Sequence, residues 1–167
     1  MSIGIDGAGG FIDYNDSATA AVPLVLTDGV WVQLTNDGLG PFSNRKYAPY
    51  GVSDLMDTPS GLLNFSELEY GDAVWIRNDF EVTPSIDLAT LDVRYVLGAG
   101  ASQYTLPRAV GVLARGAGIP YRQAALTEFI YMGDRNTKQN PVGVEIRLTG
   151  ADGTCVNNGA VIEVLRR

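Results

Sequence analysis

Apolar and polar residues alternate with a period of two through the second half of the chain. In residues 73–82 the even positions are mainly apolar and the odd positions mainly polar: Val74, Ile76, Phe80 and Val82 oppose Trp75, Arg77, Asp79 and Glu81. Residues 88–97 and 142–149 repeat the pattern. Successive side chains of a β-strand point to opposite faces of the sheet, so this period marks strands that bury one face. The pattern predicts antiparallel sheet.

Turn residues separate these segments at short intervals. Glycine, proline, asparagine and aspartate cluster at Gly71-Asp72, Pro84-Ser85, Gly98-Ala99-Gly100, Gly116-Ala117-Gly118, Asn140-Pro141 and Asp152-Gly153. Between them we expect further strands over 104–114, 124–132 and 154–165, the last folded over a turn at 157–159. Short strands with this spacing are typical of a sandwich or barrel. The sequence therefore predicts an all-β, antiparallel jelly-roll β-sandwich.

The N-terminal residues 1–22 are small and polar apart from Phe11, Ile12 and Tyr14. Such a segment predicts an extended arm outside the main domain, which would then span 23–167. Bulky apolar residues on a flexible segment usually await a partner. The alternative is that the segment forms an edge strand of the sandwich itself.

Residues 23–60 are expected to hold a hairpin followed by a long loop. Residues 23–26 and 30–34 look like short strands, and Asp28-Gly29 between them is a strong hairpin signal. Residues 36–60 are rich in turn signals, which predicts a loop within the domain. A loop of that length is expected to be functional or packed against a partner, and its role stays open.

Charge and hydropathy exclude several kinds of partner. The chain has 12 Lys and Arg against 19 Asp and Glu, a formal net charge of −7 at pH 7. Because an acidic chain without a basic patch repels a phosphate backbone, we expect no nucleic-acid binding. No segment reaches the roughly 18 apolar residues of a membrane span, and the N-terminus lacks the features of a signal peptide. We therefore expect no membrane partner and no export.

Missing residue types exclude much enzyme chemistry. Histidine is absent and Cys155 is the only cysteine, which removes Ser–His–Asp and Cys–His catalysis, histidine-bearing and multi-cysteine metal sites, and intrachain disulfides. We expect Cys155 to be a buried, inert thiol. Carboxylates two apart, such as Glu67 and Glu69, share a strand face as they do on any solvated sheet. We expect no enzyme, and no catalytic, cofactor-binding or metal-binding residue.

Residues 129–132 are bulky on both faces of one expected strand. Phe129 and Tyr131 fall on one face, and Ile130 and Met132 fall on the other. A strand that is apolar on both sides must be covered twice. In a small sandwich the second cover is another subunit or a loop. This pattern predicts Phe129 and Tyr131 as candidates for an interface between subunits.

Several blocks of the sequence carry a family resemblance. Tyr104-Thr-Leu-Pro-Arg through Glu128-Phe-Ile-Tyr-Met, Val142-Gly-Val-Glu-Ile-Arg-Leu and Val161-Ile-Glu-Val-Leu resemble the trimeric jelly rolls of tailed-bacteriophage virions, which are similar to the tumour-necrosis-factor-type sandwich. Phe11-Ile-Asp-Tyr-Asn-Asp, Trp31-Val-Gln-Leu-Thr-Asn-Asp-Gly and Ala73-Val-Trp-Ile-Arg-Asn-Asp-Phe-Glu-Val look like small structural proteins of aquatic bacteriophages. The resemblance spans most of residues 11–165 and consists of strand and turn patterns.

The resemblance implies a homotrimeric structural protein of the virion. The expected function is capsid decoration, in which a cement protein binds the outer shell as a trimer beside the major capsid protein and stabilises the shell by mass action. The arm residues Phe11, Ile12 and Tyr14 are then the expected capsid contact. The expected location is the capsid surface, after synthesis in the host cytoplasm.

Two other classes of function compete with this expectation. The first is a fibre-tip or tail receptor-binding module that recognises a host surface; no repeat or coiled coil precedes the domain, which favours decoration instead. The second is an enzyme, a glycan lyase or hydrolase of cupin-like shape. The absence of histidine counts heavily against a metal-dependent cupin.

Overall fold

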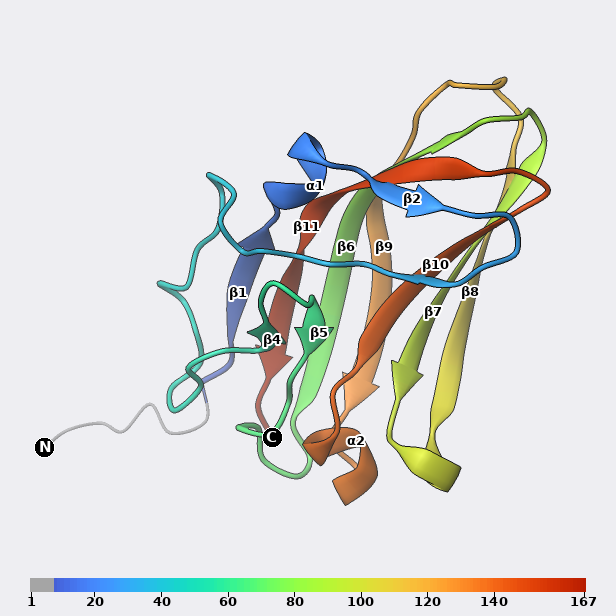
Figure 1. Cartoon of the computed structure of the whole chain (residues 1–167). Helices are drawn as coiled ribbons and strands as arrows, with labels where there is room; N and C mark the ends of the chain where they lie inside the picture. Colours follow the sequence, from blue (N-terminus) through green and yellow to red (C-terminus); the bar gives the residue numbers. More distant parts are fainter. Residues whose placement is uncertain (1–7) are drawn as a thin grey trace, which may run out of the picture.

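The computed structural model describes residues 8–167 and is a β-sandwich (Figure 1). The described chain contains long strands, a few short ones and only short helical turns. In chain order the elements are β1 (Gly10–Asn15), α1 (Ala18–Ala21), β2 (Leu24–Leu26), β3 (Val32–Gln33), β4 (Met56–Asp57), β5 (Leu62–Leu63), β6 (Ala73–Pro84), β7 (Ala89–Leu97), η1 (Gly100–Ser102), β8 (Tyr104–Leu113), β9 (Tyr121–Tyr131), α2 (Arg135–Gln139), β10 (Gly143–Thr149) and β11 (Gly153–Leu165).

Two main sheets of the described chain face each other. Sheet A has the strand order β1-β11-β6-β9, with β2 also paired to β11, and sheet B has the order β3-β10-β7-β8. All of these pairings are antiparallel. Neighbours within a sheet are mostly not consecutive in the chain, because the chain crosses repeatedly from one sheet to the other. The predicted all-β, antiparallel jelly-roll β-sandwich is confirmed.

The core lies between the sheets, where the alternating residues of the long strands meet. In β6 the side chains of Val74, Ile76, Phe80 and Val82 are fully buried, whereas Trp75 is 45% exposed on the opposite face. The apolar positions of β7 and β10 are buried in the same way: Leu91, Val93, Tyr95, Leu97, Val144, Ile146 and Leu148. Because a one-residue slip would turn every one of these side chains to the other face, burial also fixes the strand register.

The segment 10–22 belongs to the sandwich, so the predicted N-terminal arm is wrong over this range. Strand β1 pairs with β11 from Gly10, opposite Val164, to Asn15, opposite Gly159. Its inward-facing side chains, including Ile12, are fully buried. The alternative of an edge strand is confirmed, and the domain begins before residue 23. Residues 1–7 of the predicted arm lie outside the described residues.

Strands β2 and β3 do not form the predicted hairpin. Strand β2 pairs with β11 in sheet A, and β3 pairs with β10 in sheet B. The turn between them does form: Gly29 has a φ of 74°, and its N–H donates to the carbonyl of Leu148 at 2.8 Å. The turn carries the chain from sheet A to sheet B. Strand β2 pairs with the long strand β11, and β3 pairs with β10, instead of with each other.

Strand β11 runs unbroken through the residues that predicted a turn. The register against β6 shifts between Asn157 and Gly159, which is a β-bulge in a continuous strand. Gly159 has a φ of 137°, and a Cβ on it would collide with the carbonyl oxygen of Tyr14. The Asn-Asn-Gly signal therefore encodes a bulge rather than a reversal of the chain.

The long loop 36–60 packs against β1 and covers that edge of sheet A (Figure 1). The N–H of Phe11 donates to the Tyr47 carbonyl at 2.9 Å. The hydroxyl of Tyr14 donates to the carboxylate of Asp54 and accepts from the Leu55 N–H. Burial and the hydrogen bond to Asp54 raise the pKa of this hydroxyl. The loop thus protects an edge strand that would otherwise be open to other chains.

Candidate functional site

An aromatic row crosses the outer face of sheet A, on the side away from sheet B. The strand registers place Phe11 opposite Glu163, Glu163 opposite Trp75, and Trp75 opposite Phe129. Phe11, Trp75 and Phe129 are 37%, 45% and 41% exposed. The rings of Trp75 and Phe129 lie 5.0 Å apart between centroids, and Tyr47 stacks on Phe11 at 5.2 Å. Strands distant in the sequence therefore bring two aromatic pairs onto one face of the sheet, with Glu163 between them.

The row widens toward the end of the sheet where β9 stops. The next pairs along the same face place Leu165 opposite Ala73 and Ala73 opposite Tyr131, and Tyr131 is 64% exposed. An apolar hollow of about 610 Å³ lies beside the row, over Trp75 and Val161. We call the whole surface the aromatic band, consisting of Phe11, Tyr47, Trp75, Phe129, Tyr131 and Leu165.

The chemistry of the aromatic band is that of a protein interface. Aromatic side chains are enriched at interface cores and dominate binding energy there. A cluster of large exposed apolar side chains marks an interaction surface. Each large side chain that a partner covers contributes about 1.5–3 kcal/mol.

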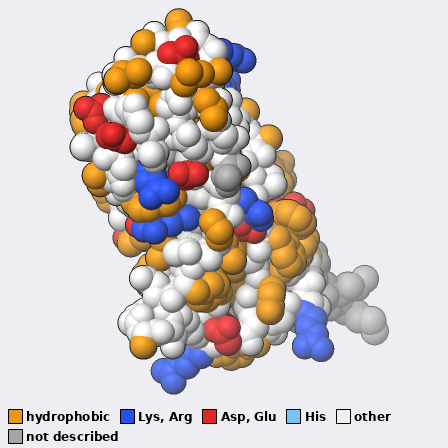
Figure 2. Space-filling view, turned by 90° about the vertical axis from the view of Figure 1, so that its right-hand side faces the viewer, with side chains coloured by type: hydrophobic (Ala, Val, Ile, Leu, Met, Phe, Trp, Pro, Cys, Tyr) orange, Lys and Arg blue, Asp and Glu red, His pale blue; other side chains and the backbone are white. Residues whose placement is uncertain are grey.

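The opposite edge of the sandwich, at β8 and β9, is open. Within the described chain β8 pairs only with β7, and β9 only with β6. Three inward-facing residues at this edge, Leu106, Val110 and Leu126, are only partly buried. Figure 2 shows the side of the molecule that is on the right in Figure 1, where hydrophobic patches alternate with basic and acidic groups. An uncovered edge strand with apolar flanks is a template for another chain.

A polar bridge ties the two sheets together at this open edge. The guanidinium of Arg108 on β8 donates to Oε1 of Glu128 on β9 at 2.8 Å, and the Phe129 N–H donates to the same oxygen. The Glu128 side chain is only 5% exposed. Its Oε2 is buried and has no hydrogen-bond partner among the described residues. An unsatisfied buried acceptor costs about 1–3 kcal/mol, and a donor from another chain would remove that cost.

The predicted site residues separate into buried and exposed groups. Ile12 and Tyr14 are 0% and 1% exposed, so their prediction as capsid contacts is wrong: alternation along β1 turns them into the core. Phe11, from the same prediction, lies on the aromatic band. Phe129 and Tyr131, predicted for a subunit interface, are also on this band and are available to a partner.

Sequence reasoning missed Trp75 and Tyr47. Trp75 stands at an odd, outward position of β6 between polar neighbours, and that signal was present in the alternation pattern. Tyr47 lies in the long loop. Its contact with Phe11 depends on how the loop folds over β1, which the local sequence does not specify.

Residues 8–167 form neither a cluster of metal-ligating side chains nor a membrane-spanning helix. Among residues 8–167 no group of three or more Asp, Glu or Cys side chains is placed to hold a metal ion. No helix formed by these residues is long and apolar enough to cross a membrane.

The thiol of Cys155 is expected to be inert in the folded protein. The residue is fully buried in β11, and burial raises the pKa of the thiol to about 12. The thiolate is the reactive form of cysteine. At pH 8 without denaturant, a disulfide reagent should therefore label less than one equivalent of Cys155 over hours. In guanidinium chloride the same reagent should label one equivalent promptly. Rapid labelling of the native protein would show that β11 is accessible.

Comparisons with known proteins find distant structural similarity only. No protein-family model matches the sequence, and the sequence of no curated protein matches it. Among solved structures, the Eiger TNF from S. frugiperda is similar with 12% identity and a TM-score of 0.44, over 95% of this chain and 92% of that chain. The infectious bursal disease virus Gt strain structure is similar with 16% identity and a TM-score of 0.39, over 87% of this chain and 33% of that chain.

Proposed function

We propose that the chain is a structural subunit of a virus particle, of the capsid-decorating type, that assembles as a homotrimer. The observation that carries the assembly is the aromatic band, which leaves Trp75, Phe129 and Tyr131 exposed on sheet A. The virion role is taken from the resemblance of the sequence to the jelly rolls of tailed-bacteriophage virions. The proposal assigns no catalytic step and no cofactor to the protein.

The positions of the two unpaired surfaces support a closed ring of subunits. The aromatic band lies on the face of sheet A, and the open edge lies at β8 and β9. A contact between two different surfaces of one chain is heterologous, and such contacts build rings when the rotation closes. In the proposed trimer, the β8–β9 edge of one subunit packs over the aromatic band of the next, and that next subunit supplies a donor to Glu128 of the packed edge.

To stabilise a shell, a decorating protein needs only to bind its assembled form. A ligand that binds only the assembled shell stabilises it by RT ln(1 + [L]/Kd), which is about 2.7 kcal/mol per site at a hundredfold excess over Kd. Three linked copies gain further through their effective concentration. A low content of charged residues, 19%, suits permanent contacts because charges are depleted at interface cores.

Imaging of purified virus particles that carry this chain tests the proposal. Decoration predicts trimeric knobs on the outer shell, over the major capsid protein, and loss of these knobs when the gene is deleted. Shells without the protein should then rupture at lower temperature. Density at a fibre or tail tip would instead support a receptor-binding module, and absence from particles would refute the virion role.

A further inference from the structure

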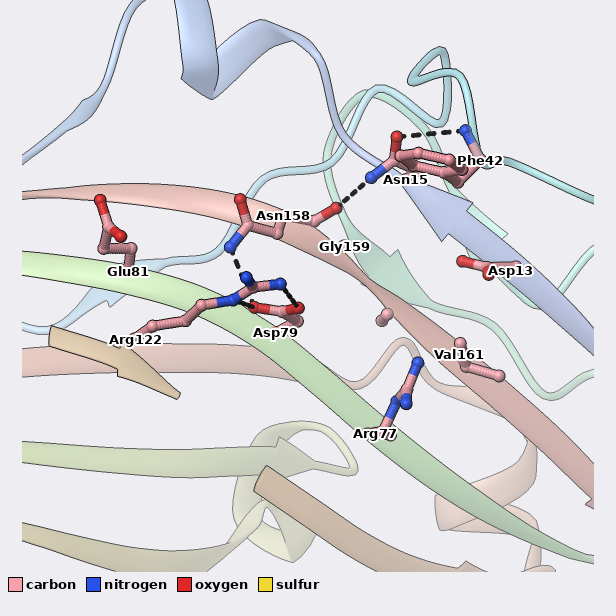
Figure 3. Close-up of a pocket in the computed structure, with 11 residues that line it drawn as sticks. Asp13, Asn15, Phe42, Arg77, Asp79, Glu81, Arg122, Asn158, Gly159 and Val161 are labelled. Carbon is pink, nitrogen blue, oxygen red and sulfur yellow. Dashed lines mark hydrogen bonds and ion pairs between the residues drawn. The ribbon is translucent and has the colours of Figure 1, made fainter. Parts of the chain in front are cut away.

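A polar hollow lies on the outer face of sheet A (Figure 3). It shares Arg77 and Val161 with the hollow beside the aromatic band. The β-bulge in β11 brings Gly159 into the row between Asn15 on β1 and Asp79 on β6. Because Gly159 has no side chain, the row has a gap, and a hollow of about 490 Å³ opens above it. This size is in the range of small-molecule sites, and bulges often occur beside functional sites.

One wall of the hollow is held rigidly by charge-assisted hydrogen bonds. Arg122 on β9 donates to both carboxylate oxygens of Asp79, at 3.0 and 2.6 Å. The side chain of Asn158 donates to the same carboxylate at 2.9 Å. These bonds, chiefly the one from Arg122, hold the pKa of Asp79 below its usual range. Such paired, bidentate groups keep a fixed geometry.

The floor of the hollow includes two charged side chains whose hydrogen-bonding groups are unused. Asp13 on β1 and Arg77 on β6 stand on opposite sides of Val161 in the adjacent row. Within residues 8–167 neither side chain forms a hydrogen bond or an ion pair. Burial raises the pKa of Asp13, although the charge of Arg77 opposes that rise. The hollow thus presents one free acceptor and one free donor.

An aromatic ring completes the rim. Phe42, in the long loop, is 75% exposed. Its backbone N–H donates to Oδ1 of Asn15 at 3.3 Å, and the amide of Asn15 donates to the Asn158 carbonyl. Figure 3 shows Phe42 beside Asn15 at the edge of the hollow. The loop therefore holds an apolar ring next to the polar groups.

The charges of the lining nearly cancel: three carboxylates, Asp13, Asp79 and Glu81, face two guanidinium groups, Arg77 and Arg122, which leaves one negative charge. Asp79 is neutralised by Arg122, and Glu81 faces the same arginine across the strand pair. Asp13 would repel an anion, and Arg77 would repel a cation. A neutral molecule with several hydroxyl groups can donate to Asp13 and accept from Arg77 together, and its C–H face can lie on the ring of Phe42.

We propose that this hollow binds a neutral hexose unit of a glycan, with Asp13 and Arg77 binding its hydroxyl groups and Phe42 covering its apolar face. This ligand site goes beyond the structural role proposed above and does not depend on it. On a particle surface it would give each subunit a weak affinity for carbohydrate, multiplied by the number of copies.

Titration of the unaltered ¹⁵N-labelled protein with neutral methyl hexosides tests the proposal by NMR. The methyl glycosides of glucose, galactose and mannose serve as probes, with sialic acid and glucosamine as the anionic and cationic comparisons. We expect saturable shifts with at least one neutral glycoside, centred on the amides of Asn15, Asn158 and Gly159, and at least tenfold weaker binding of both ions.

Substitutions identify the binding groups. Arg77→Ala, Asp13→Asn and Phe42→Ala are each expected to weaken binding by about tenfold or more, equivalent to about 1.4 kcal/mol. The matched controls are Arg135→Ala, an exposed arginine on α2, and Leu39→Ala, an exposed residue of the same loop, and both should bind as the unaltered protein does. No binding of any neutral glycoside, preference for an ion, shifts centred elsewhere, or unchanged binding by Arg77→Ala would each overturn the proposal. If the protein is not a trimer, these binding measurements still test the carbohydrate site.

Discussion

Replacing Ile12 with alanine is expected to lower the free energy of unfolding by about 2–5 kcal/mol, the usual cost of deleting a fully buried isoleucine side chain. Ile12 is 0% exposed, and its backbone pairs with Ile162 in β11. Its loss leaves a cavity in the core beneath the edge strand β1, which closely packed neighbours fill poorly. Guanidinium chloride denaturation followed by tryptophan fluorescence measures the change.

The adjacent residue provides the matched control. Phe11→Ala removes a larger side chain from the same strand, but this side chain is on the outer face and 37% exposed. It should therefore change the unfolding free energy of a subunit less than Ile12→Ala does, and weaken self-association instead. Equal stability of Ile12→Ala and the unaltered protein would mean that β1 is detached in solution.

The double substitution Phe129→Asp with Tyr131→Asp is expected to abolish the trimer while leaving the subunit folded. Both side chains are exposed in the single chain, so carboxylates are tolerated there. In the assembly they would be buried without partners, at a cost of at least about 2 kcal/mol each. The dissociation constant should rise by more than about a hundredfold. Sedimentation velocity at micromolar concentration, together with circular dichroism, gives the measurement.

A second double variant controls for added charge on exposed apolar positions. Val30→Asp with Ile86→Asp alters residues that are 50% and 58% exposed, in turns away from the aromatic band. It should sediment as the unaltered protein does. If both double variants remain trimeric, the subunit contact lies elsewhere on the molecule.

The long strands were predictable because their alternation extends over many residues. Strand β6 keeps a buried even face and an outward odd face along its length, and chance rarely produces such a run. Strand β1 alternates over only six residues among small polar neighbours, which is too few to distinguish it from an arm. Its place is decided by the backbone of β11, about 150 residues later in the chain, and by the loop that folds over it.

Local turn signals were correct about backbone shape and wrong about topology. The glycine at position 159 does adopt a positive φ, but inside a continuous strand, where it makes a bulge. Gly29 does turn the chain, yet the flanking strands join different sheets. A short sequence specifies a dihedral angle, whereas the partner of a strand depends on packing over the whole domain.

The candidate sites depend most on long-range register. Phe129 was identified from its own strand, because residues 129–132 are bulky on both faces. Trp75, Phe11 and Phe129 become one surface only when β1, β11, β6 and β9 are aligned. The polar hollow likewise needs the bulge at Gly159 to open a gap beside Asp79. Neither alignment is encoded within a single segment of sequence.

Sedimentation equilibrium of the unaltered protein tests most directly whether the aromatic band and the open β8–β9 edge are subunit contacts. The protein should be a trimer at micromolar concentration and should dissociate only on extensive dilution. Cross-linking of the trimer should join β9 of one subunit to sheet A of the next. A monomer that persists at concentrations of tens of micromolar would contradict the account, because the aromatic band would then have no partner in another copy of the chain.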